Sequence, residues 1–265
     1  MRRIRPPALL LLLVLLGCPL GALAQGGPPY LTTDPGTPGN ANWEINLGAM
    51  ATHAAGATAW QLPQLDINFG IGERIQLTYQ QSYVLVGGSD APQVSGWGNA
   101  LLGVKWRFLD QGEGGWQLSA FPQFETAGSA RAQRDGIAGD GPRWLLPVEV
   151  ARRIGPLDVN LEVGYYVPRN GAYERFAGLV IGRQVSERLE LDGELYADRA
   201  SGPPPDDTTL DLGFRYKLSP AFIVLGMVGR SVSGDAAGHT QFMGYLGLQI
   251  LLAEYGRSLQ RANGP

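Results

Sequence analysis

The sequence predicts an all-β fold, an antiparallel transmembrane β-barrel of about 12 strands, and two observations lead to it. Apolar and polar residues alternate in segments such as 157–163 (LDVNLEV) and 189–195 (LELDGEL), which places each kind on its own face of a strand. Twelve such segments are each about 11 residues long, which matches the roughly 9–11 residues of a tilted spanning strand better than the about 5–6 of a soluble one. We therefore expect the apolar face to meet lipid and the charged face to line the barrel.

Residues 1–24 are predicted to be a signal peptide. A basic start at residues 1–5 and an apolar run at 8–16 precede small residues, so we expect cleavage before Gln25. The apolar run is shorter than the roughly 20 residues of a transmembrane helix. The alternative is lipoprotein processing, which would leave Cys18 as a lipidated N-terminus. Cleavage before Gln25 would remove the only cysteine and all thiol chemistry with it.

Composition excludes one class of partner and one kind of span. The formal charge of −3 would become −6 without the leader, because three arginines and no acid would be lost. A mildly acidic chain without a basic run is a poor nucleic-acid binder, so we expect no nucleic acid among the partners. Beyond the leader no segment is apolar enough for a membrane helix, so any span must consist of strands. The 38 glycines also favour strands and turns over helices.

The chain divides into four predicted parts: the signal peptide (1–24), an N-terminal arm (25–41), the barrel (42–251) and a periplasmic tail (252–265). Strands are expected at 42–52, 59–71, 75–86, 97–109, 116–126, 143–153, 157–168, 173–184, 189–199, 208–218, 221–232 and 240–251. Short links alternate with longer ones, as periplasmic turns alternate with outer loops in such barrels. The longer links are 87–96, 127–142, 200–207 and 233–239.

Two segments outside the predicted strands, loop 127–142 and the N-terminal arm, allow alternative interpretations. Loop 127–142 is polar and rich in glycine, and we expect it to extend into solvent rather than fold over the mouth of the barrel. Asp34 and Pro35 in the arm could belong to a plug inside the lumen. A turn before the first strand is the more common role of this residue pair, and it is the one we expect.

Aromatic residues gather near the predicted strand ends, which is typical of the two girdles of a membrane barrel. They include Trp43, Trp60, Trp97, Trp106, Trp116, Trp144, Tyr165, Tyr166, Tyr173 and Tyr216. Simple alternation points Trp60 and Trp97 inward, so either a bulge near Pro63 and Gly96 shifts the register or these rings face the mouth. Aromatic residues also flank strands of soluble sheets, which makes a β-sandwich the rival fold.

Alternation gives the inner face charged residues of both signs, with acids in excess. The lumen-lining candidates are Glu44, Asp66, Lys105, Arg107, Glu149, Asp158, Glu162, Glu190, Asp192, Glu194, Asp211, Arg215, Lys217 and Arg230. Cross-strand pairs such as Glu190 or Asp192 with Lys217 or Arg215 would offset the cost of burying these charges. Either a narrow wet channel or a closed, salt-bridged lumen is compatible with these charges. About 12 strands is intermediate between filled 8-stranded barrels and open ones of 16–18 strands, which favours a narrow channel. The excess of acids predicts mild cation preference.

Several short stretches resemble a known family. Residues 28–35 (PPYLTTDP), 43–45 (WEI), 103–108 (GVKWRF) and 244–250 (GYLGLQI) are similar to recurrent stretches of the outer-membrane family named for the MetA-pathway of phenol degradation, a transporter-type β-barrel family. The resemblance implies a β-barrel and passage of small molecules, with aromatic compounds suggested by the family name. It brings no functional residue. Because a polar tail follows the last strand, the barrel-assembly machinery would have to recognise an internal segment, residues 245–250.

We expect an outer-membrane protein that is not an enzyme, needs no cofactor, and passes small solutes passively across the lipid bilayer. The alternatives are a closed structural or binding barrel, and a lipid-hydrolysing outer-membrane enzyme. For the enzyme, barrel closure would bring the loops of His53 and His239 together, near Ser231, Ser233 and Asp235. Both histidines lie among small loop residues and no nucleophile motif is present, which argues against catalysis.

Overall fold

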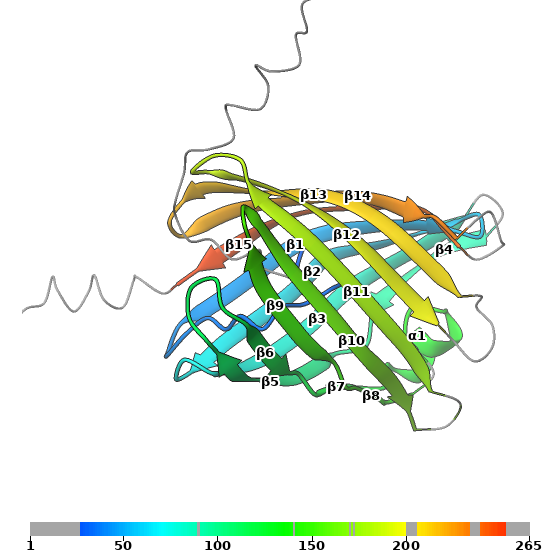
Figure 1. Ribbon diagram of the computed structural model, residues 1–265. Coiled ribbons are helices and arrows are strands. Elements are labelled where there is room, and N and C mark those ends of the chain that lie inside the picture. Colours follow the sequence, from blue (N-terminus) through cyan, green and yellow to red (C-terminus); the bar gives the residue numbers. More distant parts are fainter. Residues whose placement is uncertain are drawn as a thin grey trace, which may run out of the picture.

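The computed structural model describes residues 27–88, 91–139, 141–169, 171, 173–199, 206–233 and 239–252 (Figure 1). The predicted signal peptide with Cys18, and the predicted tail after Leu252, lie outside the described residues.

The described chain is built almost entirely of strands. They are β1 (Trp43–Ala54), β2 (Ala57–Ile71), β3 (Ile75–Gly88), β4 (Ala91–Trp97), β5 (Leu101–Asp110), β6 (Gln117–Ala120), β7 (Gln123–Glu125), β8 (Arg143–Leu145), β9 (Val148–Ile154), β10 (Leu157–Pro168), β11 (Glu174–Gln184), β12 (Leu189–Arg199), β13 (Asp207–Ser219), β14 (Phe222–Ser231) and β15 (Thr240–Leu251). The described part of the chain also holds a short helix, α1 (Ala130–Arg134). Among the described residues no helix is both long and apolar enough to cross a membrane.

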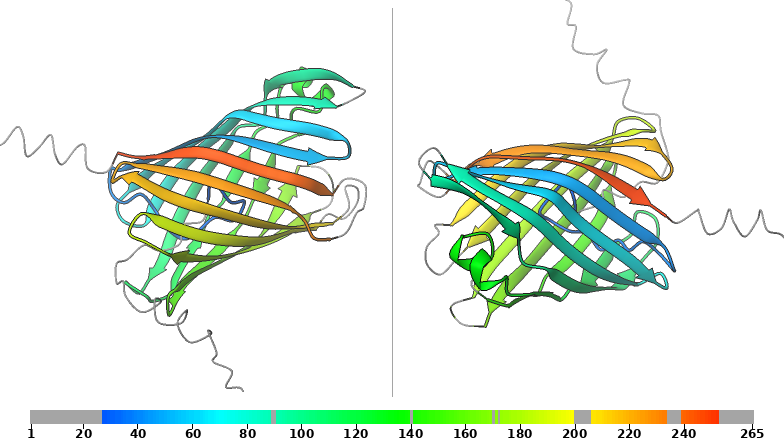
Figure 2. Two further views of the ribbon diagram at one scale, coloured as in Figure 1. Left: turned by 90° about the horizontal axis from the view of Figure 1, so that it is seen from above. Right: turned by 180° about the vertical axis from the view of Figure 1, so that it is seen from behind.

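All strand pairs are antiparallel, and the sheet closes on itself because β1 pairs with β15 and β3 with β5 (Figure 2). Predicted strands 116–126 and 143–153 are each divided in two, as β6 with β7 and β8 with β9. Predicted strand 97–109 corresponds to β5, and β4 precedes β5 in the same span with only Trp97 inside the predicted range. When the strands of one span are joined, the 15 strands in the described part of the chain make 12 spans. The predicted fold class, an antiparallel barrel of about 12 strands, is therefore confirmed.

Two of the divisions fall at prolines, Pro122 between β6 and β7 and Pro147 between β8 and β9. Proline has no N–H to offer the ladder, so it interrupts a strand. The backbone bonds continue across both gaps, since the Phe121 N–H donates to the Pro147 carbonyl at 3.1 Å and the Val104 N–H donates to the Pro122 carbonyl at 3.0 Å. The wall of the barrel thus stays closed where the strands are broken.

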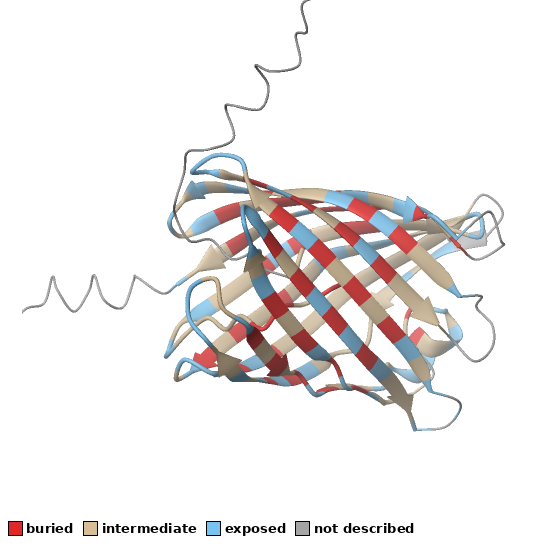
Figure 3. Cartoon of the chain, in the orientation of Figure 1, coloured by how far each residue is buried: buried red, intermediate tan, exposed pale blue. Residues whose placement is uncertain are grey.

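Inside and outside differ as the alternation predicted. On β10 the side chains of Asp158, Asn160 and Glu162 are buried, whereas Leu161 and Val163 between and beside them are 42% and 45% exposed. The same alternation runs diagonally across the neighbouring strands (Figure 3). Because the apolar side chains face outward on a closed barrel, the outer surface suits lipid rather than water.

All six tryptophans are exposed on the outer surface. For Trp60, the register of β2 against β3 shifts between Gln61 and Gln64, so the predicted bulge near Pro63 turns the ring outward. Trp97 ends β4 and packs edge-on against Tyr83 with ring centroids 5.4 Å apart. The break at 98–100 separates it from the alternation of β5.

The prediction for two of the longer links was wrong. Residues 87–88 and 91–96 are strand rather than loop, because β3 continues to Gly88 and β4 starts at Ala91. Residues 127–139 do not simply extend into solvent either. Ser129 caps α1 by accepting from the Ala132 N–H at 3.1 Å, and Ala132 and Ile137 are buried. α1 contacts β4, and these two buried apolar residues hold the segment against the barrel. The polar composition of the segment as a whole did not indicate this.

The two ends of the barrel differ. Connections 72–74, 111–116, 155–156, 185–188 and 220–221 lie at one end, which we call the turn end. The opposite end carries α1 and is called the loop end.

Candidate functional site: the lumen and its arm

Most of the predicted lumen-lining residues lie inside the barrel. Buried there are Asp66, Lys105, Glu149, Asp158, Glu162, Glu190, Asp192, Glu194, Asp211 and Arg215. Glu44, Arg107 and Lys217 lie on the same inner face nearer the turn end and are partly buried. The sequence pattern thus brings together a lumen in which acids outnumber bases.

Arg230 is placed differently from its prediction. On β14 the buried side chains are those of Ile223, Leu225 and Met227, so alternation puts Arg230 on the outer surface, where it is exposed. The prediction was wrong because β14 is apolar on both faces and its sequence gives no alternation from which to tell inside from outside.

A buried ion pair joins β5 and β9 on the inner face of the barrel. Lys105 Nζ lies 3.2 Å from Glu149 Oε1, with the two side chains only 5% and 0% exposed. Glu149 also accepts hydrogen bonds from the hydroxyls of Ser119 and Thr33. Burying an ion pair costs free energy unless the carboxylate oxygens also accept hydrogen bonds. The hydroxyls of Ser119 and Thr33 donate those hydrogen bonds to Glu149.

Four carboxylates gather on β12 and β13. Glu190 lies opposite Arg215 in the strand register and Glu194 lies opposite Asp211, with Asp192 between. The predicted pairing of Glu190 with Arg215 is thus placed correctly in the ladder. The lumen at this level carries an excess of negative charge, which attracts cations and repels anions.

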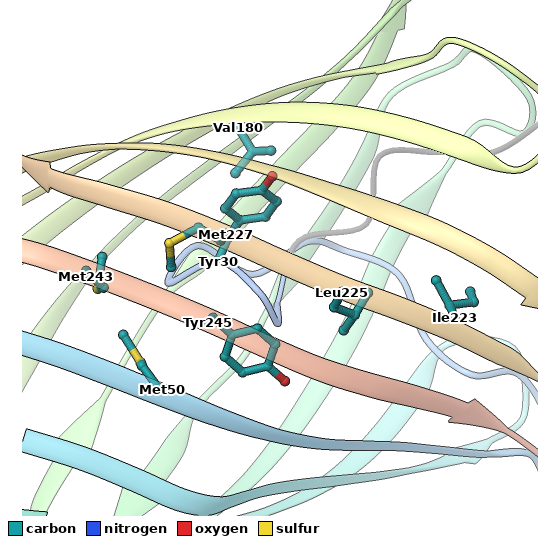
Figure 4. Close-up of a cluster of buried hydrophobic side chains, with 8 residues drawn as sticks. All are labelled: Tyr30, Met50, Val180, Ile223, Leu225, Met227, Met243 and Tyr245. Atoms are coloured by element: carbon teal, nitrogen blue, oxygen red, sulfur yellow. The ribbon is translucent and has the colours of Figure 1, made fainter.

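The N-terminal arm occupies this part of the lumen, so the expectation of no more than a turn before β1 was wrong. Tyr30, Thr32 and Asp34 are all less than 9% exposed. Tyr30 packs in an apolar cluster with side chains of β1, β11, β14 and β15 (Figure 4). The turn itself is present as well, since Asp34 accepts from the Gly36 N–H. The arm is therefore a plug held by both apolar and polar contacts.

Side chains of the wall satisfy the backbone of the arm. The N–H groups of Leu31 and Thr32 donate to Glu194 at 3.2 and 2.7 Å, and the Thr33 N–H donates to Glu162 at 2.7 Å. Asn160 Nδ2 donates to the Thr33 carbonyl at 2.7 Å, and Lys105 Nζ donates to the Asp34 carbonyl. A buried peptide group without a partner is costly, so these contacts are what permit an irregular segment inside a barrel.

Glycine makes room for the arm. A Cβ built on Gly178 of β11 would lie 1.8 Å from Thr32 Oγ1, and one on Gly70 of β2 would lie 1.9 Å from the Gly39 carbonyl oxygen. Both distances are far below van der Waals contact, so at these positions only glycine fits while the arm is in place.

We expect Gly178→Val to displace the arm without opening the barrel wall, because valine is well suited to a strand and the three atoms nearest to its Cβ all belong to Thr32. The measurement is limited proteolysis of the refolded protein, in which the arm should be cut faster than in the parent. Gly193→Val is the control, because the nearest side-chain atom to its added Cβ is 3.5 Å away. An unchanged rate at Gly178→Val would mean that the arm is not held where the structure places it.

A cavity of about 480 Å³ lies between the arm and the loop end. Tyr166, Phe176 and Tyr196 form an aromatic wall on it, with ring centroids 4.8 Å apart for the first pair and 6.1 Å for the second. Gln61, Gln64 and Gln80 also line it, from β2 and β3. In the order of 12 spans, β11 with Phe176 is six positions from β2, and β12 with Tyr196 is six positions from β3. The amides therefore face these two rings across the lumen.

Sequence reasoning missed this aromatic wall. Tyr196 follows Glu190, Asp192 and Glu194 at the same spacing of two, so alternation alone would have placed it inside. Tyr166 was assigned to an outer girdle because it lies near a strand end.

The two histidines come from neighbouring strand ends, as barrel closure predicted, since Ala54 pairs with Thr240. His53 Nδ1 lies 2.9 Å from Thr58 Oγ1 within the β1–β2 hairpin. Ser231 Oγ donates to Asp207 Oδ1 at 2.5 Å, and the Thr240 N–H donates to Asp207 Oδ2 at 3.0 Å. Asp207 thus ties together the ends of β13, β14 and β15, a structural role. Asp235 lies outside the described residues.

No family model and no curated protein sequence matches this chain, so the resemblance to the MetA-pathway family stays a prediction. Solved structures do match. The COG4313 outer membrane channel from Pseudomonas putida F1 covers 85% of this chain and 99% of its own, with a TM-score of 0.60 and 14% identity. The NanC porin covers 78% and 98%, with a TM-score of 0.57 and 7% identity. The KdgM porin, solved in complex with a disordered oligogalacturonate, covers 77% and 98%, with a TM-score of 0.53 and 12% identity. At these identities the likeness shows that the chain has the fold of outer-membrane β-barrels.

Proposed function

We propose that the protein is an outer-membrane channel through which small solutes, small aromatic compounds among them, pass passively. The observation that carries the proposal is that the arm fills this part of the lumen. Side chains of the described wall hold the arm in place. The wall residues that face the arm include glycines such as Gly178 and Gly213. If the arm moves aside, we expect the wall to leave a passage, since 12 strands lie between the filled barrels of about 8 strands and the open ones of 16–18.

Two further observations support this proposal. The three solved barrels reported above are named as channels or porins. The aromatic wall formed by Tyr166, Phe176 and Tyr196 offers ring faces to a solute that enters from the loop end. The signal peptide, the outer-membrane location and recognition of residues 245–250 by the barrel-assembly machinery belong to the same proposal.

The first test is the single-channel conductance of the refolded, leader-free protein in a planar bilayer. Steady openings with cation preference would support a channel. A barrel that inserts and stays electrically silent would favour the second candidate, a closed structural or binding barrel. The specific observation in favour of that candidate is the arm, whose buried backbone is well satisfied in the plugged state.

The excess of acids predicts how ion preference responds to mutation. We expect the triple variant Glu190→Gln, Asp192→Asn and Glu194→Gln to move the reversal potential in a salt gradient toward zero, because the lumen loses three negative charges. Glu187→Gln, in an exposed turn, should leave it unchanged. An unchanged reversal potential in the triple variant would show that ions do not pass these carboxylates.

A further inference from the structure

We propose that the cavity beside the aromatic wall is a binding site for a small organic cation, an alkyl- or arylammonium ion. The inference rests on the proposed channel function, because it names the class of solute that the channel would take up from the loop end. Three features of the cavity lining argue for a cation rather than a neutral or anionic solute.

The first feature is the number of aromatic rings. Tyr30 and Tyr245 line the cavity together with the aromatic wall, so five rings from the arm and four strands surround it. The faces of such rings carry negative potential and attract ammonium groups within about 6 Å. One ring already holds a cation of the protein itself, since the Arg143 guanidinium lies 4.3 Å from the centroid of Tyr166.

The second feature is the charge of the lining. Among the described residues that line the cavity, Asp66, Glu125 and Glu162 are acids and Arg143 is the one Lys or Arg. That arginine is already engaged, because it lies 3.0 Å from Glu125 and 3.6 Å from Glu174. The lining thus carries negative charge that a cationic solute would neutralise and an anionic solute would oppose.

The third feature is the environment of Asp66. Its carboxylate accepts from the amides of Asn46 at 3.0 Å, Asn68 at 3.1 Å and Gln80 at 3.2 Å. These donors are neutral amides that hold the carboxylate and its charge in place. Asp66 is 6% exposed, so little water screens that charge. It therefore places a carboxylate, held by three amides, at the cavity on the side opposite the aromatic wall.

Arm and cavity are adjacent, because Gly27, Tyr30 and Leu31 are part of the lining. A cation bound in this cavity would contact the arm. We expect the cation to stay in the cavity as long as the arm stays in the lumen.

The experiment is a calorimetric titration in which benzyltrimethylammonium is added to the refolded, leader-free protein in detergent micelles. Benzyl alcohol is the neutral probe and benzoate the anionic one, and both carry the same phenyl ring as the ammonium ion. We expect the ammonium ion to bind, and benzoate to bind at least about tenfold more weakly. Phe176→Leu keeps an apolar side chain and removes one ring, and it should weaken ammonium binding about two- to fivefold. Asp66→Asn removes the charge with almost no change of shape and should weaken it as well.

Glu187→Gln serves as the control and should bind like the parent. Binding of benzoate or benzyl alcohol as tight as that of the ammonium ion would overturn the proposal. Unchanged ammonium binding in Asp66→Asn would overturn it too, and this variant answers the question even if Phe176→Leu fails to refold. Conduction of potassium without ammonium binding would refute the site and leave the channel standing. Ammonium binding without conduction would support the site and refute the channel.

Discussion

A chain that begins at Gly39 should conduct several-fold more than the chain that begins at Gln25. The shortened chain lacks the segment whose backbone is bound by Glu162 and Glu194, together with the buried ring of Tyr30. Water can then reach the inner carboxylates and hydrate them, which offsets the loss of their hydrogen bonds to the arm. Cutting before Gly39 keeps the contacts of Asn40 and Ala41 with the β2–β3 turn, where Asn40 accepts from the Gly72 N–H at 2.9 Å. The barrel rim is therefore preserved, and single-channel recording in a planar bilayer measures the effect.

A second variant separates loss of the arm from its movement. Glu162→Gln with Glu194→Gln keeps the arm and weakens its charge-assisted hydrogen bonds, which are roughly twice as strong as neutral ones. We expect brief openings of this variant to the conductance level of the shortened chain. Equal conductance in the shortened and longer chains would show that the arm does not limit the current, and that the constriction lies elsewhere in the wall.

The barrel itself could be predicted from the sequence because each strand carries its own alternation. On β10 and β12 the polar residues recur at every second position, so inside and outside are decided locally and burial follows. β14 shows the limit of this reasoning. Where Ile223, Val224 and Leu225 follow one another, the face that turns inward is decided by the register with β13 and β15. Arg230 was misplaced for this reason.

The arm could not be predicted, for a different physical reason. Residues 27–41 have no periodicity, and the groups that bind them lie far along the chain. Leu31 is 163 positions from Glu194, and Thr33 is 129 positions from Glu162. An irregular segment next to a barrel has the same local sequence whether it enters the lumen or lies outside it. What decides between the two is the match between its peptide groups and the inner carboxylates, which exists only once the barrel has closed.

Replacing Lys105 by methionine should destabilise the barrel by about 3–5 kcal/mol, because the change leaves Glu149 buried without its cation. Methionine has nearly the length of lysine, so the change removes charge more than volume. Lys105 also donates to the Asp34 carbonyl and lies 4.6 Å from the centroid of Phe121, so the variant should loosen the arm as well. The free energy of unfolding can be measured by urea titration of the protein in lipid vesicles, followed by tryptophan fluorescence.

Two further variants make the measurement decisive. Lys105→Met combined with Glu149→Gln should recover much of the lost stability, because a neutral pair with its hydroxyl partners costs less to bury than a lone carboxylate. Arg131→Met breaks the pair with Asp135 at 3.4 Å on α1, where the arginine side chain is 82% exposed, and it should cost less than about 1 kcal/mol. If Lys105→Met costs no more than Arg131→Met, water reaches Glu149 in the native barrel. The lumen would then be wet around the arm, and ions could pass beside the plug without displacing it.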